Sequence, residues 1–264
     1  MAPGGRTMRL TTLTLLFTLT ACAHGGGSNP PAPIASTEQH PFSVLDMLAM
    51  DRISDPQVSP DGQRIAFVLR ATDLENDRGR TDVYTIPTAG GEPRRLTDDP
   101  AADGSPRWSA DGATIFFLSS RSGSSQVWSV SASGGKATQI SDLPLPVSNL
   151  AVSPDGQTLA FSVEVFVDCP NLACTHQRLE ERKASKRTGV EYDRLFVRHW
   201  DQYKDGRRNH LFVMPISGGP ARDLTQGLGA DVPSKPFGGS DEFAFAPDGK
   251  SIVYSARVAG DAEP

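Results

Sequence analysis

The sequence has 264 residues, with 25 glycines, 21 prolines and a formal net charge of −5. Nucleic-acid-binding domains usually carry a basic excess, so this charge argues against that class of protein. The length is enough to bury a sizeable core, and the many glycines and prolines favour short strands joined by turns. We therefore expect a β-rich protein that has no nucleic-acid partner.

Residues 1–23 have the pattern of an export signal. Two arginines precede an apolar run over residues 10–20, which is too short to span a membrane as a stable helix. The run ends in Leu-Thr-Ala-Cys, which resembles the bacterial lipoprotein box, in which the cysteine, here Cys22, becomes lipidated. Ala23 fits outer-membrane sorting, so we predict an exported, periplasmic lipoprotein that a lipid anchors to the outer membrane.

Two other interpretations of this segment stay open. Ala21, Cys22 and Ala23 also fit a signal cleaved after Ala23, which would release a soluble protein, and an uncleaved segment would itself act as an anchor. Residues 24–37 are rich in glycine, serine and proline, as in a flexible linker. Residues 42–50 predict a short helix, capped at its start, whose apolar face packs on the first unit of the domain that follows.

A Ser-Pro-Asp-Gly turn followed by an apolar strand recurs along the rest of the chain. It occurs at residues 59–62, 109–112, 153–156 and 246–249, with alanine in place of proline in the second copy and in place of serine in the fourth. Proline and aspartate suit a tight turn, and glycine takes the left-handed position after it. The copies lie 50, 44 and 93 residues apart, and repeats of about 40–50 residues built from short strands indicate a β-propeller.

Each repeat has the pattern of four strands, which is one propeller blade. We expect blade one over about residues 55–98, with a polar loop at 71–81, and blade two over about 106–140. Trp108 and Trp128 fall at strand positions and are interpreted as core or inter-blade packing.

The third blade is interrupted. Its first strands lie near residues 149–163 but the next strand begins only near 211, so residues 164–209 form an insertion, partly helical. Blade four opens near 242 and supplies two strands. Residues 38–264 are thus predicted to be all-β: about three and a half four-stranded blades of a partial β-propeller, with a short N-terminal helix and a helical insertion in blade three. Such a ring is open, so we expect a piece of a longer protein.

The insertion contains Cys169 and Cys174. Because disulfides form in exported proteins, we predict a local disulfide between these two cysteines, with free thiols as the alternative. A metal site needs more ligands than His176 supplies. The segment 176–187 predicts a charged helix, which is either a solvated face or a docking surface for another domain or subunit.

Two stretches carry a family resemblance. Residues 54–62 and 192–201, the latter continuing to 213, make the chain similar to the N-terminal propeller of the prolyl oligopeptidase family of serine peptidases. Within that family it looks closest to bacterial dipeptidyl-peptidase and acylaminoacyl-peptidase-like members. These enzymes use a Ser-Asp-His triad on an α/β-hydrolase domain that follows the propeller. This sequence has no G-x-S-x-G motif, so the resemblance assigns no catalytic residue, and we expect no cofactor and no metal.

The resemblance implies peptide substrates. Exopeptidases recognise a free N-terminal amine, and related dipeptidyl peptidases do so with acidic propeller side chains through charge-assisted hydrogen bonds. The substrate-binding candidates are therefore Asp193, Arg198, His199, Trp200 and Asp201. A packed tryptophan whose flanking charges form a structural network is the simpler interpretation of the same residues.

Two functions are compatible with these features. The chain is either the substrate-gating propeller of an exported serine exopeptidase, inactive by itself and paired with its own C-terminal α/β-hydrolase domain, or a TolB-like periplasmic propeller that binds proteins. The turns and the export signal fit both. The long insertion in blade three favours the peptidase, which would release dipeptides or blocked residues from peptide N-termini.

Overall fold

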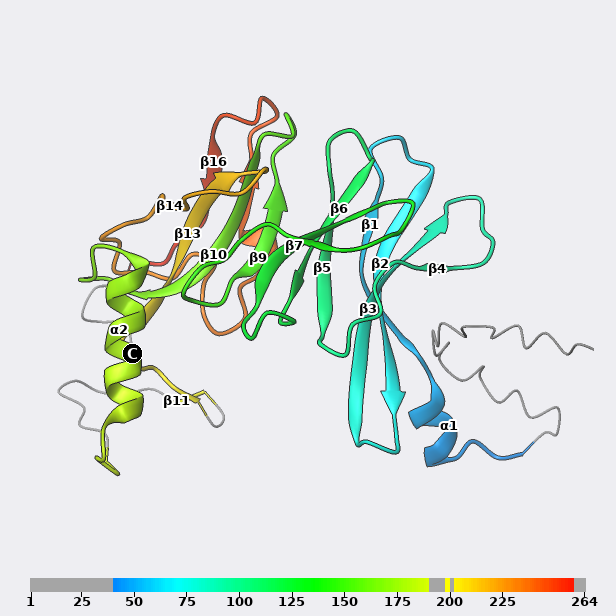
Figure 1. Ribbon diagram of the computed structural model, residues 1–264, viewed down its shortest axis with the longest axis horizontal. Coiled ribbons are helices and arrows are strands. Elements are labelled where there is room, and N and C mark those ends of the chain that lie inside the picture. The colour runs from blue at the N-terminus through cyan, green and yellow to red at the C-terminus, as the bar shows by residue number, and fades with distance from the viewer. Residues whose placement is uncertain (1–39, 190–197, 200–201, 259–264) are drawn as a thin grey trace, which may run out of the picture. The chain divides into compact units, whose positions relative to one another are not determined.

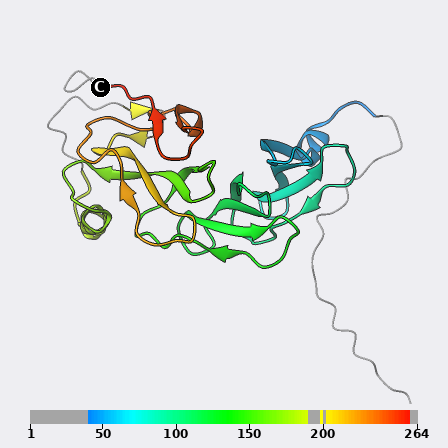
Figure 2. The same ribbon diagram turned by 90° about the horizontal axis from the view of Figure 1, so that it is seen from above.

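The computed structural model describes residues 40–189, 198–199 and 202–258, and these residues are mainly β (Figure 1). Three antiparallel four-stranded sheets follow one another in chain order, as the view from above shows (Figure 2). The predicted fold class, a partial β-propeller, is confirmed. Within the described ranges, no helix is long and apolar enough to cross a membrane.

The strands of blades one and two are consecutive in sequence, whereas α2 (Leu172–Ala184), β11 (Arg198–His199) and β12 (Gln202–Tyr203) separate the second and third strands of blade three. Blade one holds β1 (Arg52–Val58), β2 (Arg64–Asp73), β3 (Arg78–Pro87) and β4 (Arg94–Arg95). Blade two holds β5 (Asp103–Trp108), β6 (Thr114–Ser119), β7 (Gln126–Ser131) and β8 (Thr138–Gln139). Blade three holds β9 (Ser148–Val152), β10 (Thr158–Phe166), β13 (Arg207–Pro215) and β14 (Arg222–Asp223). A fourth unit supplies the pair β15 (Phe243–Phe245) and β16 (Ile252–Tyr254) after the short 3-10 turn η1 (Ser240–Glu242).

The repeated turn joins the first two strands of each unit, and its chemistry is the same in the first three. In the third copy the Ser153 hydroxyl donates to the Asp155 carboxylate at 2.6 Å and accepts the N–H of Thr158 at 2.9 Å. Gly156 has a φ of 68°, in the left-handed region that favours glycine. The serine hydrogen bond holds the pKa of Asp155 below its ordinary value of 3.8. These residues are therefore committed to closing the turn.

Apolar clusters fill the spaces between consecutive blades. The cluster between blades one and two includes Ala66 and Val83 of the first and Ile115 and Phe117 of the second, all fully buried. Trp108 lies there as well, and its indole N–H donates to the Gln57 carbonyl at 2.9 Å, which ties β5 to β1. Trp108 is thus inter-blade packing, as predicted from its strand position.

The polar segment 71–81 is not a loop, contrary to the prediction. β2 and β3 continue through it as a paired hairpin, with Thr72 opposite Gly79 and Asp73 opposite Arg78, and only residues 74–77 turn. Asp73 and Arg78 form an ion pair at 3.2 Å. Charged side chains can face water from both strands of a hairpin while the backbone pairs, so polarity was a poor guide here.

The predicted helix forms but does not pack as expected. α1 (Val44–Ala49) begins at Ser43, which shares a capping box with Asp46. The helix contacts β2 of blade one, but Phe42, Val44 and Leu45 are 71%, 68% and 66% exposed, so it does not bury an apolar face there. With six residues the helix is too short to lay a continuous apolar stripe against a sheet.

Ser153→Ala should lower the free energy of unfolding by about 1–2 kcal/mol, because it removes two hydrogen bonds of a buried hydroxyl. The fourth unit provides the matched control, since it already has alanine at the same place. Ala246→Ser should change stability by no more than about 0.5 kcal/mol. Urea unfolding measures both variants, and an equal effect of the two would contradict this role of the hydroxyl.

The stability loss in Ser153→Ala should also depend on pH. A lowered carboxyl pKa stabilises the folded state above the unfolded value of 3.8, and this contribution is lost as pH falls through the folded pKa. The stability difference between the native protein and Ser153→Ala should therefore shrink on acidification below about pH 4.

Candidate functional site

The insertion of blade three lies between β10 and β13 and is shorter than predicted. Glu164, Val165 and Phe166 pair with Asn209, Arg208 and Arg207, so three residues at each predicted end belong to the sheet. The insertion proper therefore spans residues 167–206. Its helix, α2 (Leu172–Ala184), starts and ends before the predicted limits of 176 and 187.

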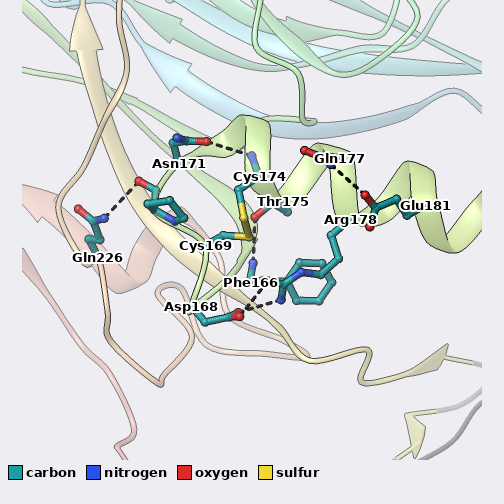
Figure 3. The surroundings of a disulfide bond; sticks show 11 residues. Phe166, Asp168, Cys169, Asn171, Cys174, Thr175, Gln177, Arg178, Glu181 and Gln226 are labelled. Atoms are coloured by element: carbon teal, nitrogen blue, oxygen red, sulfur yellow. Dashed lines mark hydrogen bonds and ion pairs between the residues drawn. A yellow bond between two sulfur atoms is a disulfide. The ribbon is translucent and has the colours of Figure 1, made fainter.

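Covalent and hydrogen bonds fasten the start of α2 to the end of β10 (Figure 3). A disulfide joins Cys169 and Cys174, and Asn171 caps the helix by accepting the N–H of Cys174 at 2.9 Å. Thr175, which is fully buried, accepts the backbone N–H of Phe166 at 3.2 Å. The first turn of the helix is therefore held at several points.

Arginine side chains hold the next turns of α2. Arg178 donates to both carboxylate oxygens of Asp168 at 2.8 Å, and these hydrogen bonds lower the pKa of Asp168 and raise the pKa of Arg178 (Figure 3). Arg178 and Arg182 both lie 4.6 Å from the centre of the Phe166 ring. The outward side of the helix, including His176 and Lys183, is exposed.

Most of the predicted substrate-binding residues lie outside the described residues. This applies to Asp193, Trp200 and Asp201, and also to the predicted lipidation site, Cys22. Arg198 and His199 form the short strand β11 (Arg198–His199), which pairs with β12 (Gln202–Tyr203). No group of His, Cys, Asp and Glu side chains suited to a metal ion occurs in the described part of the chain.

The innermost strands share a second repeated feature. β1, β5 and β9 each form an edge of their sheet, β5 contacts both of the others, and β9 contacts η1. Each inner strand has an irregular register, and Asp55, Ser105 and Asn149 there have φ values of 48°, 52° and 56°. Non-glycine residues rarely take this conformation, and bulges of this kind re-aim side chains and are common beside binding sites.

Arg107 connects three of the units at these strands. Its guanidinium donates to the two carboxylate oxygens of Asp55 at 3.0 and 2.8 Å and to the Ser240 hydroxyl at 3.2 Å. Gln57 also donates to Asp55 at 2.7 Å. Side chains from blade one, blade two and the fourth unit therefore meet in one hydrogen-bonded group.

A cleft of about 400 Å³ opens between the inner parts of blades one and two. Its charged lining residues are Asp55 and Asp103. Six hydroxyl residues also line it: Ser54, Thr81, Ser105, Ser119, Ser120 and Ser125. Among the described residues the lining contains no lysine, arginine or histidine, and each of its two carboxylates pairs with an arginine, Arg107 or Arg121.

Asp103 lines this cleft, and only one of its two carboxylate oxygens accepts a hydrogen bond from a described residue. Its side chain is fully buried, and one carboxylate oxygen accepts from Arg121 at 2.6 Å. The other oxygen, Oδ1, is buried and has no hydrogen-bond partner among the described residues. Buried carboxylate oxygens are normally hydrogen-bonded, so Asp103 Oδ1 is an exception within the part of the chain that the structure describes.

Sequence reasoning missed Asp55, Asp103, Ser105 and Arg107. One signal was available: Asp55, Ser105 and Asn149 each lie four residues before the serine of a repeated turn. The left-handed backbone at these positions leaves only a weak trace in the sequence, because aspartate and asparagine occur in many turns.

Comparison with known proteins identifies what the chain is similar to. Residues 49–184 match the family model of the TolB beta propeller domain. Dipeptidyl-peptidase 5 of Porphyromonas gingivalis is 29% identical over 238 residues, which cover 88% of this chain and 33% of that protein. Dipeptidyl-peptidase 5 of Porphyromonas endodontalis is 27% identical over 256 residues, which cover 95% of this chain and 36% of that protein. The chain thus spans about a third of the length of these curated relatives.

A solved structure supports the fold. An acylaminoacyl peptidase in complex with Z-Gly-Gly-Phe-chloromethyl ketone superposes with a TM-score of 0.50 at 15% identity. The match covers 67% of this chain and 26% of that chain. At this identity the likeness concerns the fold alone.

Removing the disulfide with Cys169→Ser and Cys174→Ser together should loosen α2 without loosening the blade. A disulfide that closes a loop this short stabilises the folded state by roughly 2 kcal/mol, because it lowers the conformational entropy of the unfolded chain. Amides of α2 should therefore exchange with solvent at least about tenfold faster in the double variant. Amides of β10 and β13 should be unchanged. Hydrogen exchange measures both, with Cys22→Ser as the cysteine control. Unchanged exchange in α2 would show that the arginine contacts suffice to hold it.

Proposed function

The chain belongs to the TolB beta propeller domain family, and on this premise we propose that it is the substrate-gating propeller of an exported serine exopeptidase. The observation that carries the proposal is the match to two dipeptidyl-peptidases over 88% and 95% of this chain. In this proposal the propeller admits peptides by size and helps to bind their N-termini. Its partner is an α/β-hydrolase domain in the same polypeptide, which supplies the catalytic serine.

A second function has its own support. A TolB-like periplasmic propeller that binds other proteins fits the family match over residues 49–184 without any hydrolase domain. The coding sequence after Pro264 separates the two: a G-x-S-x-G motif followed by aspartate and histidine supports the peptidase, and a stop after a few more blades supports the binding protein.

The activity assay tests the first proposal directly. The product of the complete gene should release dipeptides from a dipeptidyl chromogenic substrate, whereas the 264-residue chain alone should not, because it contains no G-x-S-x-G motif. Hydrolysis by the chain alone, or none by the complete product, would contradict the proposal.

The insertion is proposed to contribute to substrate binding through Asp193 and Asp201, with Arg198, His199 and Trp200 beside them. Asp201→Ala in the complete protein should raise KM for free-amine dipeptide substrates roughly tenfold, because a charge-assisted hydrogen bond to the amine is lost. Substrates with a blocked N-terminus should be much less affected. Glu92→Ala, which removes an exposed carboxylate elsewhere, is the control. An equal rise for free and blocked substrates would remove Asp201 from amine recognition.

The cellular location is also a proposal. We infer that Cys22 is lipidated and anchors the protein to the outer membrane, on the basis of the Leu-Thr-Ala-Cys sequence after the apolar run. Cells fed a labelled fatty acid should incorporate it into the native protein and not into Cys22→Ser. Labelling of the variant, or release of the native protein into the soluble periplasm, would favour the ordinary secretory signal.

A further inference from the structure

We propose that blade three contains a pH-sensitive switch, formed by the buried side chain of His210 on β13 and by Asp223 on β14. The protonated ring holds residues 226–233, the connection that leads from blade three to the fourth unit. Loss of a ring proton as pH rises releases this connection and loosens the packing of the fourth unit. The inference concerns the propeller itself and does not rest on the proposed function.

The two hydrogen bonds of the His210 ring are the central observation. The residue is 1% exposed, its Nδ1 lies 2.7 Å from a carboxylate oxygen of Asp223, and its Nε2 lies 3.0 Å from the Leu228 carbonyl oxygen. An ionised carboxylate and a carbonyl are both acceptors, whereas a neutral imidazole has a single N–H to donate. The imidazolium, with an N–H on each nitrogen, is therefore the form of the ring that satisfies both contacts.

Asp223 is the charged group that faces the ring. Three other charged residues lie on the elements around His210: Glu164 on β10, Arg222 on β14 and Asp231 in the connection. Glu164 and Asp231 are each paired with other cations, and Arg222 is exposed. Among the described residues, the positive charge of the ring is therefore balanced by Asp223.

The equivalent positions of the other two blades contain no histidine. The two positions are Asp82 and Arg95 in blade one, Gln126 and Gln139 in blade two, and His210 and Asp223 in blade three. Histidine is the residue type among these whose ordinary pKa lies closest to neutral pH. Blade three is therefore the blade in which this pair is suited to respond to pH.

The equivalent residue of blade two also holds a connection to the next unit. The Gln126 amide donates to the carbonyl oxygens of Leu143 and Leu145, between blades two and three, at 3.0 and 3.2 Å. His210 makes the corresponding contact with Leu228. A glutamine amide does not titrate, so glutamine at position 210 would be a donor whose strength is independent of pH.

Deprotonation of the ring acts on one of its two contacts. The remaining N–H stays on Nδ1, because the charged carboxylate of Asp223 is the stronger acceptor. Nε2 then presents a lone pair to the Leu228 carbonyl oxygen, and the hydrogen bond to the connection is lost. The contact between β13 and β14 remains.

The connection carries this change to the fourth unit. Val232 is fully buried and packs with Phe243 of β15 and with Ala160 and Leu211 of blade three. Leu228 packs against the same apolar cluster. A looser connection therefore loosens the cluster that joins the fourth unit to blade three.

NMR of the ¹⁵N-labelled full chain tests the protonation state. At about pH 6 both ring nitrogens of His210 should carry a proton, and the signals of this ring are identified by their loss in His210→Gln. A ring with a single proton at that pH would overturn the proposal. This measurement uses the native protein, so it holds even where a variant fails to fold.

Hydrogen exchange tests the consequence for the connection. Between about pH 6 and pH 9, after correction for the intrinsic rise of exchange with pH, the amides of Leu228 and Val232 should lose protection roughly tenfold, because one buried hydrogen bond is lost. The amides of Val83 and Val127, on the equivalent strands of blades one and two, should keep their protection.

Three variants show whether His210 is the cause. His210→Gln should remove the pH dependence at Leu228 and Val232, and so should the double variant His210→Gln with Asp223→Gln, which copies the residues of blade two. His176→Gln, which removes an exposed histidine, should retain it. Equal protection at both pH values in the native chain, or the same loss in the native chain and in His210→Gln, would overturn the proposal.

Discussion

The ion pair between Arg107 and Asp55 is the contact on which the arrangement of the inner strands depends. Both side chains are partly sheltered, at 16% and 28% exposure, and two N–H···O bonds of 3.0 and 2.8 Å join them. Both bonds come from Nη1, which also donates to the Pro106 carbonyl at 2.7 Å, and charge-assisted hydrogen bonds are stronger than neutral ones. Because Arg107 also reaches Ser240, the same side chain sets the position of β5 relative to β1 and to the fourth unit. The cleft beside Asp103 exists between strands that this contact holds.

The insertion and the cleft are two different kinds of candidate site. α2 is fixed to the end of β10 by a disulfide, a bidentate ion pair and a buried threonine, and it turns a charged face to solvent. The cleft lies instead between the inner parts of blades one and two, and its lining includes Asp55 and Asp103. Loops carried on a rigid scaffold commonly bind substrates, and so do clefts that the scaffold itself forms.

The repeated turn made most of the fold predictable. Serine, aspartate and glycine each have a local role in that turn, so its four copies placed the strands β2, β6, β10 and β16 without any tertiary information. Composition was a poor guide elsewhere. The polar residues near Asp73 form a paired hairpin instead of a loop, and most apolar side chains of α1 remain exposed. The cleft could not be predicted, because Asp103 becomes a buried, half-paired carboxylate only when Arg121, 18 residues away, takes its other oxygen.

Hydrogen exchange in Arg107→Gln tests the central claim, that the Arg107 side chain holds the inner strands of three units together. Amides of β1 and β5 should exchange faster in this variant than in the native chain, whereas those of α2, which Arg107 does not contact, should be unchanged. Unchanged exchange in β1 and β5 would contradict the account.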